Sequence, residues 1–214
     1  MVSDFAIAVL ISGRGSNFIA IQQRIEEGSL PARIACVISS RADAPGLAYA
    51  TERGIPTLVM PGKEQPEEKI TTFLLEAFRK YDVALVVLAG FLRKIPRAVV
   101  EEWPDRIINI HPALLPSFGG KGMYGRRVHE AVLAYGCKVS GATVHLVSAD
   151  YDTGPPVLQR CVPVYEDDTP ETLAGRVLQV EHALLPEAVA LFASGQVVVS
   201  GRTVRTGATK LTQS

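Results

Sequence analysis

Long apolar runs alternate with amphipathic stretches along the first half of the chain. Residues 5–11, 34–39 and 83–88 are almost entirely apolar, which is typical of strands that are covered on both faces. Residues 67–81 carry apolar side chains at helical spacing, which predicts an amphipathic helix. This alternation predicts an α/β fold with a doubly wound, mostly parallel sheet and helices on both faces.

The stretch at 107–116 carries the most informative polar residues. A strand is predicted at 107–111, because Pro112 has no amide hydrogen to donate to a neighbouring strand. Alternation then places Asn109 and His111 on the same face, at the carboxyl edge where open α/β sheets bind ligands. An amide and an imidazole at this edge can donate a hydrogen bond and shuttle a proton. The alternative is a structural histidine beside a turn asparagine.

The glycine-containing loop at 12–17 lies between the first predicted strand and a helical pattern. Strand, glycine loop and helix form an anion-binding arrangement, since backbone N–H groups and the positive end of the helix face one point. A dinucleotide site is disfavoured, because Phe18 stands at the third glycine position and residues 39–41 lack the acidic ribose ligand. The pattern favours a phosphomonoester held by Gly15, Ser16 and Asn17; a tight turn without a ligand is the alternative.

Two loops offer further binding features. In the loop at 89–96, the apolar side chains and main-chain groups of residues 92–95 suit a flat heterocycle. Residues 117–125 include four glycines, and a loop of this kind next to a site often acts as a lid. Each is an ordinary solvated loop in the alternative interpretation.

The loop at 148–155 carries two carboxylates, Asp150 and Asp152. We expect one of them to sit against His111, where it raises the pKa of the imidazole and keeps it protonated toward neutral pH; a solvated acidic turn is the alternative. His145, inside a strand predicted at 138–147, is interpreted as structural. His129 opens a predicted helix and is more often structural than catalytic in such a position; substrate binding, because it is close to the glycine-rich loop, is the alternative.

The last third of the chain predicts one long helix and a hairpin. Thr169, Pro170 and Glu171 start the helix, and Glu181 lies within it among apolar residues. A small hairpin follows around Gly201, and residues from about 206 to 214 are predicted to be disordered. No repeat or low-complexity linker interrupts the pattern, so we expect a single domain over residues 1–214.

Composition narrows the range of partners. Lys plus Arg and Asp plus Glu number 22 each, so the formal net charge of zero does not favour a nucleic-acid or anionic-membrane partner. The longest apolar run is about half the length that spans a bilayer, and no secretory signal pattern is evident. The three cysteines are far apart and none forms a CxxC pair. These features predict a cytoplasmic, reduced protein.

Five segments, in order, resemble the phosphoribosylglycinamide formyltransferase family, whose members carry out folate-dependent formyl transfer in purine synthesis. The segments are ISGRGSN, LAGFLRKIP, NIHPALLPSF, SGATVHLVSADYDTGP and EHALLPEAV. The similarity runs from residue 9 to about 195. The resemblance implies a formyltransferase-like fold, 10-formyltetrahydrofolate as co-substrate and no metal. It also implies small-molecule partners, phosphoribosylglycinamide and the formylfolate, and a monomer or homodimer.

The resemblance also implies roles for individual positions. The catalytic residues would be Asn109, His111 and Asp152, with Asn109 and protonated His111 donating to the oxyanion of a tetrahedral intermediate. The substrate phosphate would be bound by Gly15, Ser16 and Asn17, and the ribose hydroxyls by Glu181. The residues around the folate would be Leu92, Arg93, Lys94, Ile95, Asn109, Ser148, Ala149, Asp150 and Tyr151.

The chain departs from the family pattern at a few positions. Leu146 stands where an aromatic residue is frequent, and Leu178 where a polar phosphate or ribose contact is usual. The loop at 119–127 is longer than in many members. The family's basic contact with the folate tail has no clear counterpart, and residues 67–69 offer Lys69 as a candidate for it.

Three alternative functions remain open. Methionyl-tRNA formyltransferase has the same central Asn, His and Asp but adds a basic C-terminal domain. Formyltetrahydrofolate hydrolase usually adds an N-terminal regulatory domain, whereas the first strand here is predicted from residue 5. A non-catalytic folate or nucleotide binder is the third alternative, disfavoured because all three catalytic positions hold chemically competent residues.

Overall fold

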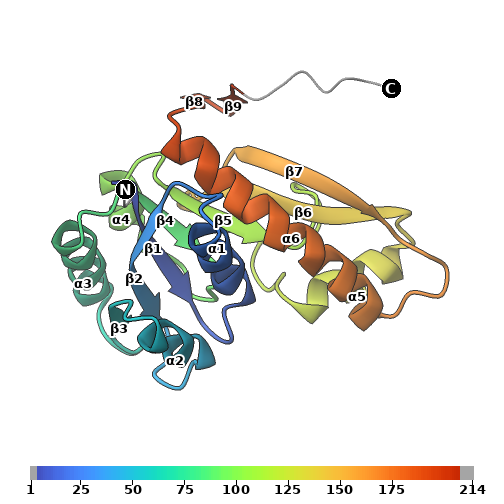
Figure 1. Ribbon diagram of the computed structural model, residues 1–214. Helices are drawn as coiled ribbons and strands as arrows, with labels where there is room; N and C mark the ends of the chain where they lie inside the picture. The colour runs from blue at the N-terminus through green and yellow to red at the C-terminus, as the bar shows by residue number, and fades with distance from the viewer. Residues whose placement is uncertain (1–3, 208–214) are drawn as a thin grey trace.

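The structure, a computed structural model, describes residues 4–207. Seven strands form one sheet in the order β3-β2-β1-β4-β5-β6-β7, and β8 and β9 form a separate hairpin (Figure 1). The strands are β1 (Ala6–Ile11), β2 (Arg33–Ser39), β3 (Thr57–Val59), β4 (Leu85–Leu88), β5 (Ile107–His111), β6 (Val139–Leu146), β7 (Pro156–Pro163), β8 (Val197–Ser200) and β9 (Thr203–Thr206). The helices are α1 (Ser16–Glu26), α2 (Pro45–Glu52), α3 (Glu67–Lys80), α4 (Arg97–Glu102), α5 (Arg126–Tyr135) and α6 (Pro170–Ala193).

The sheet is parallel from β3 through β5, and β6 and β7 join it antiparallel. Its two faces carry separate hydrophobic cores, to which successive residues of β1 contribute alternately. Val9 and Ile11 face the core that contains residues of α1, α5 and α6, whereas Leu10 faces the core that contains residues of α3 and α4. Apolar residues on both faces explain the uninterrupted run in the sequence. The predicted doubly wound, mostly parallel sheet with helices on both faces is therefore confirmed.

Two glycine residues and a capping threonine set the ends of the helices and strands that position the site. Gly15 precedes α1 with a left-handed backbone (φ 71°), and Gly90 turns the chain after β4 with φ 73°. Thr169 caps α6, its side chain accepting a hydrogen bond from the N–H of Thr172. The helix predicted to open at His129 begins three residues earlier, at Arg126.

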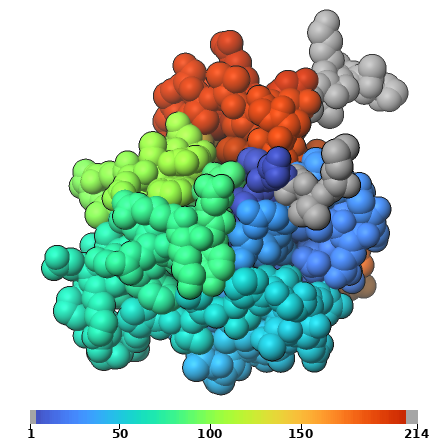
Figure 2. Space-filling model, turned by 60° about the vertical axis from the view of Figure 1, so that its left-hand side comes forward, coloured from blue at the N-terminus to red at the C-terminus, as the bar shows by residue number. Residues whose placement is uncertain are grey.

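The hairpin β8–β9 packs at one end of the molecule, and the segment around α2 forms the opposite end (Figures 1 and 2). Arg202 lies in the turn of this hairpin, and its guanidinium donates a hydrogen bond to the carbonyl of Thr153 at 3.0 Å. The disorder predicted from about residue 206 mostly concerns residues outside the described part of the chain; Thr206 itself belongs to β9. Within residues 4–207, no helix is long and apolar enough to cross a membrane.

Candidate active site

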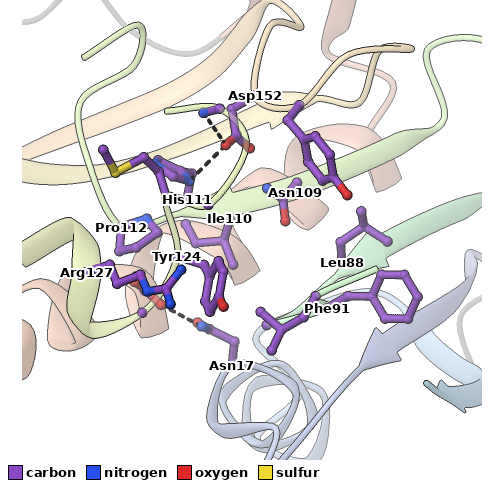
Figure 3. A pocket seen from close by; sticks show the side chains of 18 of the residues that line it. Asn17, Leu88, Phe91, Asn109, Ile110, His111, Pro112, Tyr124, Arg127 and Asp152 are labelled. Carbon is purple, nitrogen blue, oxygen red and sulfur yellow. Dashed lines mark hydrogen bonds and ion pairs between the residues drawn. The ribbon is translucent and has the colours of Figure 1, made fainter. Parts of the chain in front are cut away.

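The carboxyl end of β5 brings Asn109 and His111 to the edge of the sheet. The strand ends at His111, directly before Pro112, as the sequence predicts. The antiparallel register of β6 places His145 opposite Asn109. Figure 3 shows Asn109, His111 and Asp152 gathered in one region of a cavity, with Asp152 contributed by the loop between β6 and β7.

Asp152 lies between two imidazoles. Its Oδ2 is 3.6 Å from Nδ1 of His111, and its Oδ1 is 3.6 Å from Nε2 of His145. The N–H of Gly120, from the glycine-rich loop, donates to Oδ2 at 2.9 Å. Of the two carboxylates that the sequence offered as partners of His111, Asp152 is the one in contact, whereas Asp150 is exposed and pairs with Lys94 at 3.9 Å.

The amide of Asn109 is oriented by His145. Nδ1 of His145 lies 2.9 Å from the carbonyl of Leu146, which can only accept, so Nδ1 carries the ring proton. With Nδ1 as the donor, Nε2 is oriented to accept a hydrogen bond from Nδ2 of Asn109, at 3.0 Å. An Asn amide has two N–H donors, and this bond uses one of them. The amide group is thereby held in place and retains one N–H for another acceptor.

The pKa of His111 is lowered from its ordinary value, because burial disfavours the charged ring. Asp152 and the carbonyl of Phe118, which is 2.8 Å from Nε2, oppose this effect but do not reverse it, and the charge of His145 adds slightly to the lowering. The expectation that Asp152 keeps His111 protonated toward neutral pH is therefore wrong for the net pKa. Only 3% of His111 is exposed, so the cost of removing water from the charged ring outweighs one carboxylate at 3.6 Å.

The carboxyl of Asp152 has a lowered pKa. Burial, the largest single influence, raises it, but several contacts together lower it more: Nε2 of His145 at 3.6 Å, the imidazole of His111 and the N–H of Gly120. Asp152 also has a left-handed backbone with φ 55°, which is uncommon for a residue with a side chain. The loop thus presents an ionised carboxylate to both imidazoles.

These groups open into a cavity of about 830 Å³, large enough for two small molecules in contact. Its walls combine the loop after β4, the end of β5, the loops at 120–125 and 147–152, and the first halves of α1, α5 and α6. Tyr124 and Arg127 project into it in Figure 3, with the guanidinium of Arg127 5.2 Å from the ring centroid of Tyr124. Among the described residues, no group of three or more His, Cys, Asp or Glu side chains is arranged to hold a metal ion.

One end of the cavity holds the residues assigned to phosphate and ribose. Ser16 and Asn17, in the first turn of α1, line it together with Glu181 of α6. Nδ2 of Asn17 donates to Oε2 of Glu181 at 2.7 Å, which joins two segments that lie 164 positions apart. Burial raises the pKa of Glu181, and the bond from Asn17 partly offsets this. Gly15 lies behind the wall, where an added Cβ would meet the ring of Phe18 at 3.3 Å.

The residues assigned to the folate divide into two groups. Leu92, Arg93 and Lys94 line the cavity from the loop after β4. Ser148, Asp150 and Tyr151 line it from the loop after β6, together with Asn109. Ile95 is buried in the core under α3 and α4, and neither it nor Ala149 belongs to the cavity wall.

Sequence reasoning missed several cavity residues. His145 was interpreted as structural, and its Nδ1 is indeed bonded to the carbonyl of Leu146, but its Nε2 faces Asn109 and Asp152. His129 also lines the cavity, on α5. The signal that identifies His145 is the strand register, which becomes visible only once the β5–β6 pairing is known.

The mostly parallel sheet with an Asn, His and Asp cluster at its edge is the arrangement of a class of transferase. Residues 5–189 match the family model described as formyl transferase, so the chain belongs to the formyl transferase family. It is 46% identical over 185 residues to a chloroplastic phosphoribosylglycinamide formyltransferase of Arabidopsis thaliana, a match that covers 86% of this chain and 63% of that protein.

Two further comparisons agree with this family assignment. The chain is 43% identical over 192 residues to the trifunctional purine biosynthetic protein adenosine-3 of Bos taurus, covering 89% of this chain and 18% of that protein. The crystal structure of glycinamide ribonucleotide transformylase 1 from Symbiobacterium toebii superimposes with a TM-score of 0.88 at 44% identity, covering 94% of this chain and 93% of that one. The chain thus spans less than two thirds of the plant relative and a small part of the bovine one, but nearly the whole of the bacterial enzyme.

Proposed function

We propose that the protein transfers the formyl group of 10-formyltetrahydrofolate to the amine of phosphoribosylglycinamide, as the names of its relatives indicate for them. The observation that carries this proposal is the single cavity that joins three parts: the start of α1 with Glu181, the Asn109–His111–Asp152 cluster, and the loop at 92–94. The first part would bind the phosphorylated ribose of the acceptor, and the last would bind the heterocycle of the formyl donor. The cluster between them would hold the reacting amine and the formyl carbon.

Ser16 and Asn17 would bind the phosphate through the N–H groups of the first turn of α1, where the helix dipole favours an anion. Glu181 would accept hydrogen bonds from the ribose hydroxyls. Its carboxylate is buried and already receives one hydrogen bond from Asn17, so its orientation is fixed before the substrate arrives. The glycinamide end would then point toward His111.

On the other side of the cluster, Leu92, Arg93 and Lys94 would face the folate from one wall and Ser148, Asp150 and Tyr151 from the other. Lys94 links the two walls, because its Nζ lies 3.9 Å from Oδ1 of Asp150 and 5.7 Å from the ring centroid of Tyr151. Ile95 and Ala149 would support this arrangement through the backbone rather than by side-chain contact, and Gly15 would do the same at the phosphate end.

In the proposed chemistry the free amine attacks the formyl carbon, a C–N bond forms, and the formyl oxygen gains negative charge. The remaining N–H of Asn109 is suited to donate to that oxygen. Neutral His111 accepts a proton from the attacking nitrogen, and Asp152 stabilises the imidazolium that results. His111 then returns the proton to N10 of the folate as the bond between N10 and the formyl carbon breaks. The steps require a proton acceptor and hydrogen-bond donors, but no metal.

We further propose that one domain acts as a monomer or homodimer in the cytoplasm, without nucleic-acid or membrane partners. The residues proposed to bind both substrates and to carry the reaction all line one cavity of a single chain. All three cysteines are unpaired, which suits a reducing compartment, although the plant relative is chloroplastic. Sedimentation of the purified protein measures the oligomeric state.

A steady-state assay tests the proposed function. Formation of the deformylated folate is followed with and without phosphoribosylglycinamide, and the formylated product is identified by mass spectrometry. We expect folate product in stoichiometric amounts with formylated ribonucleotide, and little without the amine. Equal rates with and without the amine would identify a hydrolase instead, and binding of both ligands without turnover would identify a non-catalytic binder.

A further inference from the structure

The segment at 90–95, which supplies one wall of the cavity, belongs to no helix or strand. Among the described residues, two hydrogen bonds hold this segment. The N–H of Leu92 donates to Oγ of Ser12 at 2.9 Å, and the guanidinium of Arg93 donates to the carbonyl of Pro61. Only the first of these bonds involves the backbone of the segment, so the position of that backbone depends on Ser12.

The hydroxyl of Ser12 joins segments that follow three neighbouring strands. Ser12 comes directly after β1 and is only 5% exposed. Its Oγ lies 2.7 Å from Oγ of Ser40, which comes directly after β2. Because a serine hydroxyl can accept and donate at the same time, Oγ of Ser12 bonds to Ser40 while it accepts from Leu92, beyond β4. Ser12 does not line the cavity, so any effect that it has on a ligand passes through Leu92.

The phosphate end of the cavity does not need this hydroxyl. Residues 13–17 follow Ser12 in the chain, but they have their own anchor: the N–H of Gly46, in α2, donates to the carbonyl of Gly13 at 3.2 Å. An alanine in place of Ser12 keeps the main chain that leads into this loop. The hydroxyl therefore serves the wall at 92–94 and not the phosphate loop.

We propose that Ser12 is a positioning residue for the formyl donor: its hydroxyl, oriented by Ser40, fixes the N–H of Leu92 and with it the backbone of residues 92–94 that faces the folate. This inference rests on the proposed function and adds a residue that touches neither substrate. A flat heterocycle contacts apolar surface and a few main-chain groups, so the shape of this backbone determines how well the donor binds. Groups that line a site hold their geometry through hydrogen bonds behind them.

Ser12→Ala tests the proposal, because it leaves the N–H of Leu92 without its acceptor. We expect the KM for 10-formyltetrahydrofolate to rise about tenfold, the effect of one lost neutral hydrogen bond. The KM for phosphoribosylglycinamide and kcat should stay within about twofold of the wild type, because the phosphate loop and the catalytic cluster keep their contacts. Steady-state kinetics with each substrate varied in turn measure this difference.

A double-mutant cycle tests the part played by Ser40. Ser40→Ala keeps the bond from Leu92 to Ser12 but removes the group that orients the hydroxyl, so the KM for the donor should rise about threefold. Ser12→Ala combined with Ser40→Ala should be no worse than Ser12→Ala alone, since Ser40 then has no hydroxyl to orient. Multiplying losses would contradict this coupling.

Ser140→Ala is the matched control. It also removes a buried serine hydroxyl, but this one has no hydrogen-bond partner among the described residues and lies outside the cavity wall. Both KM values should therefore stay unchanged.

Amide hydrogen exchange of the ligand-free protein supplies a second readout. In Ser12→Ala the N–H of Leu92 should exchange about tenfold faster, because its hydrogen bond is gone. The N–H of Ala89, which donates to the carbonyl of Leu10, should keep its rate. Faster exchange at both amides would mean that the substitution loosens the whole sheet edge, and the assignment would fail.

An unchanged KM for the donor in Ser12→Ala, or an equal rise in both KM values, would also overturn the assignment. The wild-type assay keeps this test separate from the proposed function. If the wild type does not formylate phosphoribosylglycinamide, the proposed function fails, whereas a fully active wild type with an unaffected Ser12→Ala variant removes only the role of Ser12.

Discussion

Oδ2 of Asp152 lies 3.6 Å from Nδ1 of His111, and the other nitrogen of that ring lies 2.8 Å from the carbonyl of Phe118. Both nitrogens thus face acceptors, an arrangement that is fully satisfied only by the protonated ring. Burial nevertheless keeps the pKa of His111 low. The site therefore holds a neutral base at rest and is arranged to stabilise the imidazolium once a proton arrives.

We expect Asp152→Asn to lower the pKa of His111 further, because it removes the group that most strongly opposes the effect of burial. Formyl transfer should slow about 100-fold, or about 3 kcal/mol, since the imidazolium loses its counter-charge during the reaction. The part of the pH–rate profile in which the rate rises as His111 becomes neutral should move to lower pH. NMR titration of His111 and kcat measured against pH check both effects.

Asp150→Asn is the control for this prediction, because Asp150 lies in the same loop but has an exposed carboxylate that does not contact His111. Asp150 faces the proposed folate site, so its substitution should change the KM for 10-formyltetrahydrofolate but leave kcat nearly unchanged. His111→Ala combined with Asp152→Asn should be far less harmful than the product of the two single effects, because the residues act as a unit. Independent, multiplying losses would contradict the coupled arrangement.

The fold and the strand that carries the site could be predicted because their signals are local. Apolar runs identified the buried strands, and Pro112 marked the end of β5 after His111. The binding role of Ser16 and Asn17 was predicted from the strand, glycine loop and helix pattern, and that of Glu181 from the family resemblance. The hydrogen bond between Asn17 and Glu181, however, joins two segments 164 positions apart. No periodicity in the sequence encodes such a contact.

The rest depended on quantities that only the folded chain possesses. The role of His145 requires the register of β5 against β6, which places it opposite Asn109. The sign of the pKa shift of His111 requires its burial, and a short motif cannot weigh burial against a nearby carboxylate. The expectation for His111 was wrong because it considered the ring with a nearby carboxylate alone and left out the burial that the fold imposes.

Glu181→Gln should raise the KM for phosphoribosylglycinamide about tenfold or more and leave kcat nearly unchanged. The proposed contact with the ribose hydroxyls is made equally in the ground state and in the transition state, so its loss weakens binding without slowing chemistry. Steady-state kinetics with varied ribonucleotide measure this. Glu187→Gln, in the same helix but paired with Arg160 on the surface, should have no effect. A large fall in kcat at constant KM would instead place Glu181 in the chemistry.

Gly120→Ala should reduce kcat about fivefold to tenfold through Asp152. Gly120 has φ 97° and open space around an added Cβ, so the cost of alanine arises from the backbone, about 1 kcal/mol or more. Relaxation of that strain would move the N–H that donates to Oδ2 of Asp152. Gly28→Ala imposes a similar backbone strain (φ 72°) beyond the end of α1, outside the cavity wall. It should lower the melting temperature without changing kcat; equal kinetic losses in both variants would exclude this role for Gly120.

The free energy of unfolding should fall as the pH drops below about 6.5, because the folded state holds several histidines neutral. The pKa values of His111, His129 and His182 are all lowered, mainly by burial. Between the lowered folded value and the ordinary unfolded value of about 6.5, the unfolded chain binds more protons, so stability rises with pH in this window. The stabilisation that comes from keeping these histidines neutral is complete above the unfolded pKa of about 6.5 and is lost progressively as the pH falls below it.

Glu181 opposes this trend, since its pKa is raised by burial and the folded state takes up its proton more readily as the pH falls. Urea unfolding from about pH 8 to about pH 5 measures the net slope, and two variants separate the contributions. His182→Leu should flatten the slope, because one neutral buried imidazole is removed, whereas Glu181→Gln should steepen it, because the opposing carboxyl is gone. A free energy that stays constant from about pH 8 to about pH 5 in Glu181→Gln would mean that the buried histidines keep their ordinary pKa values in the fold.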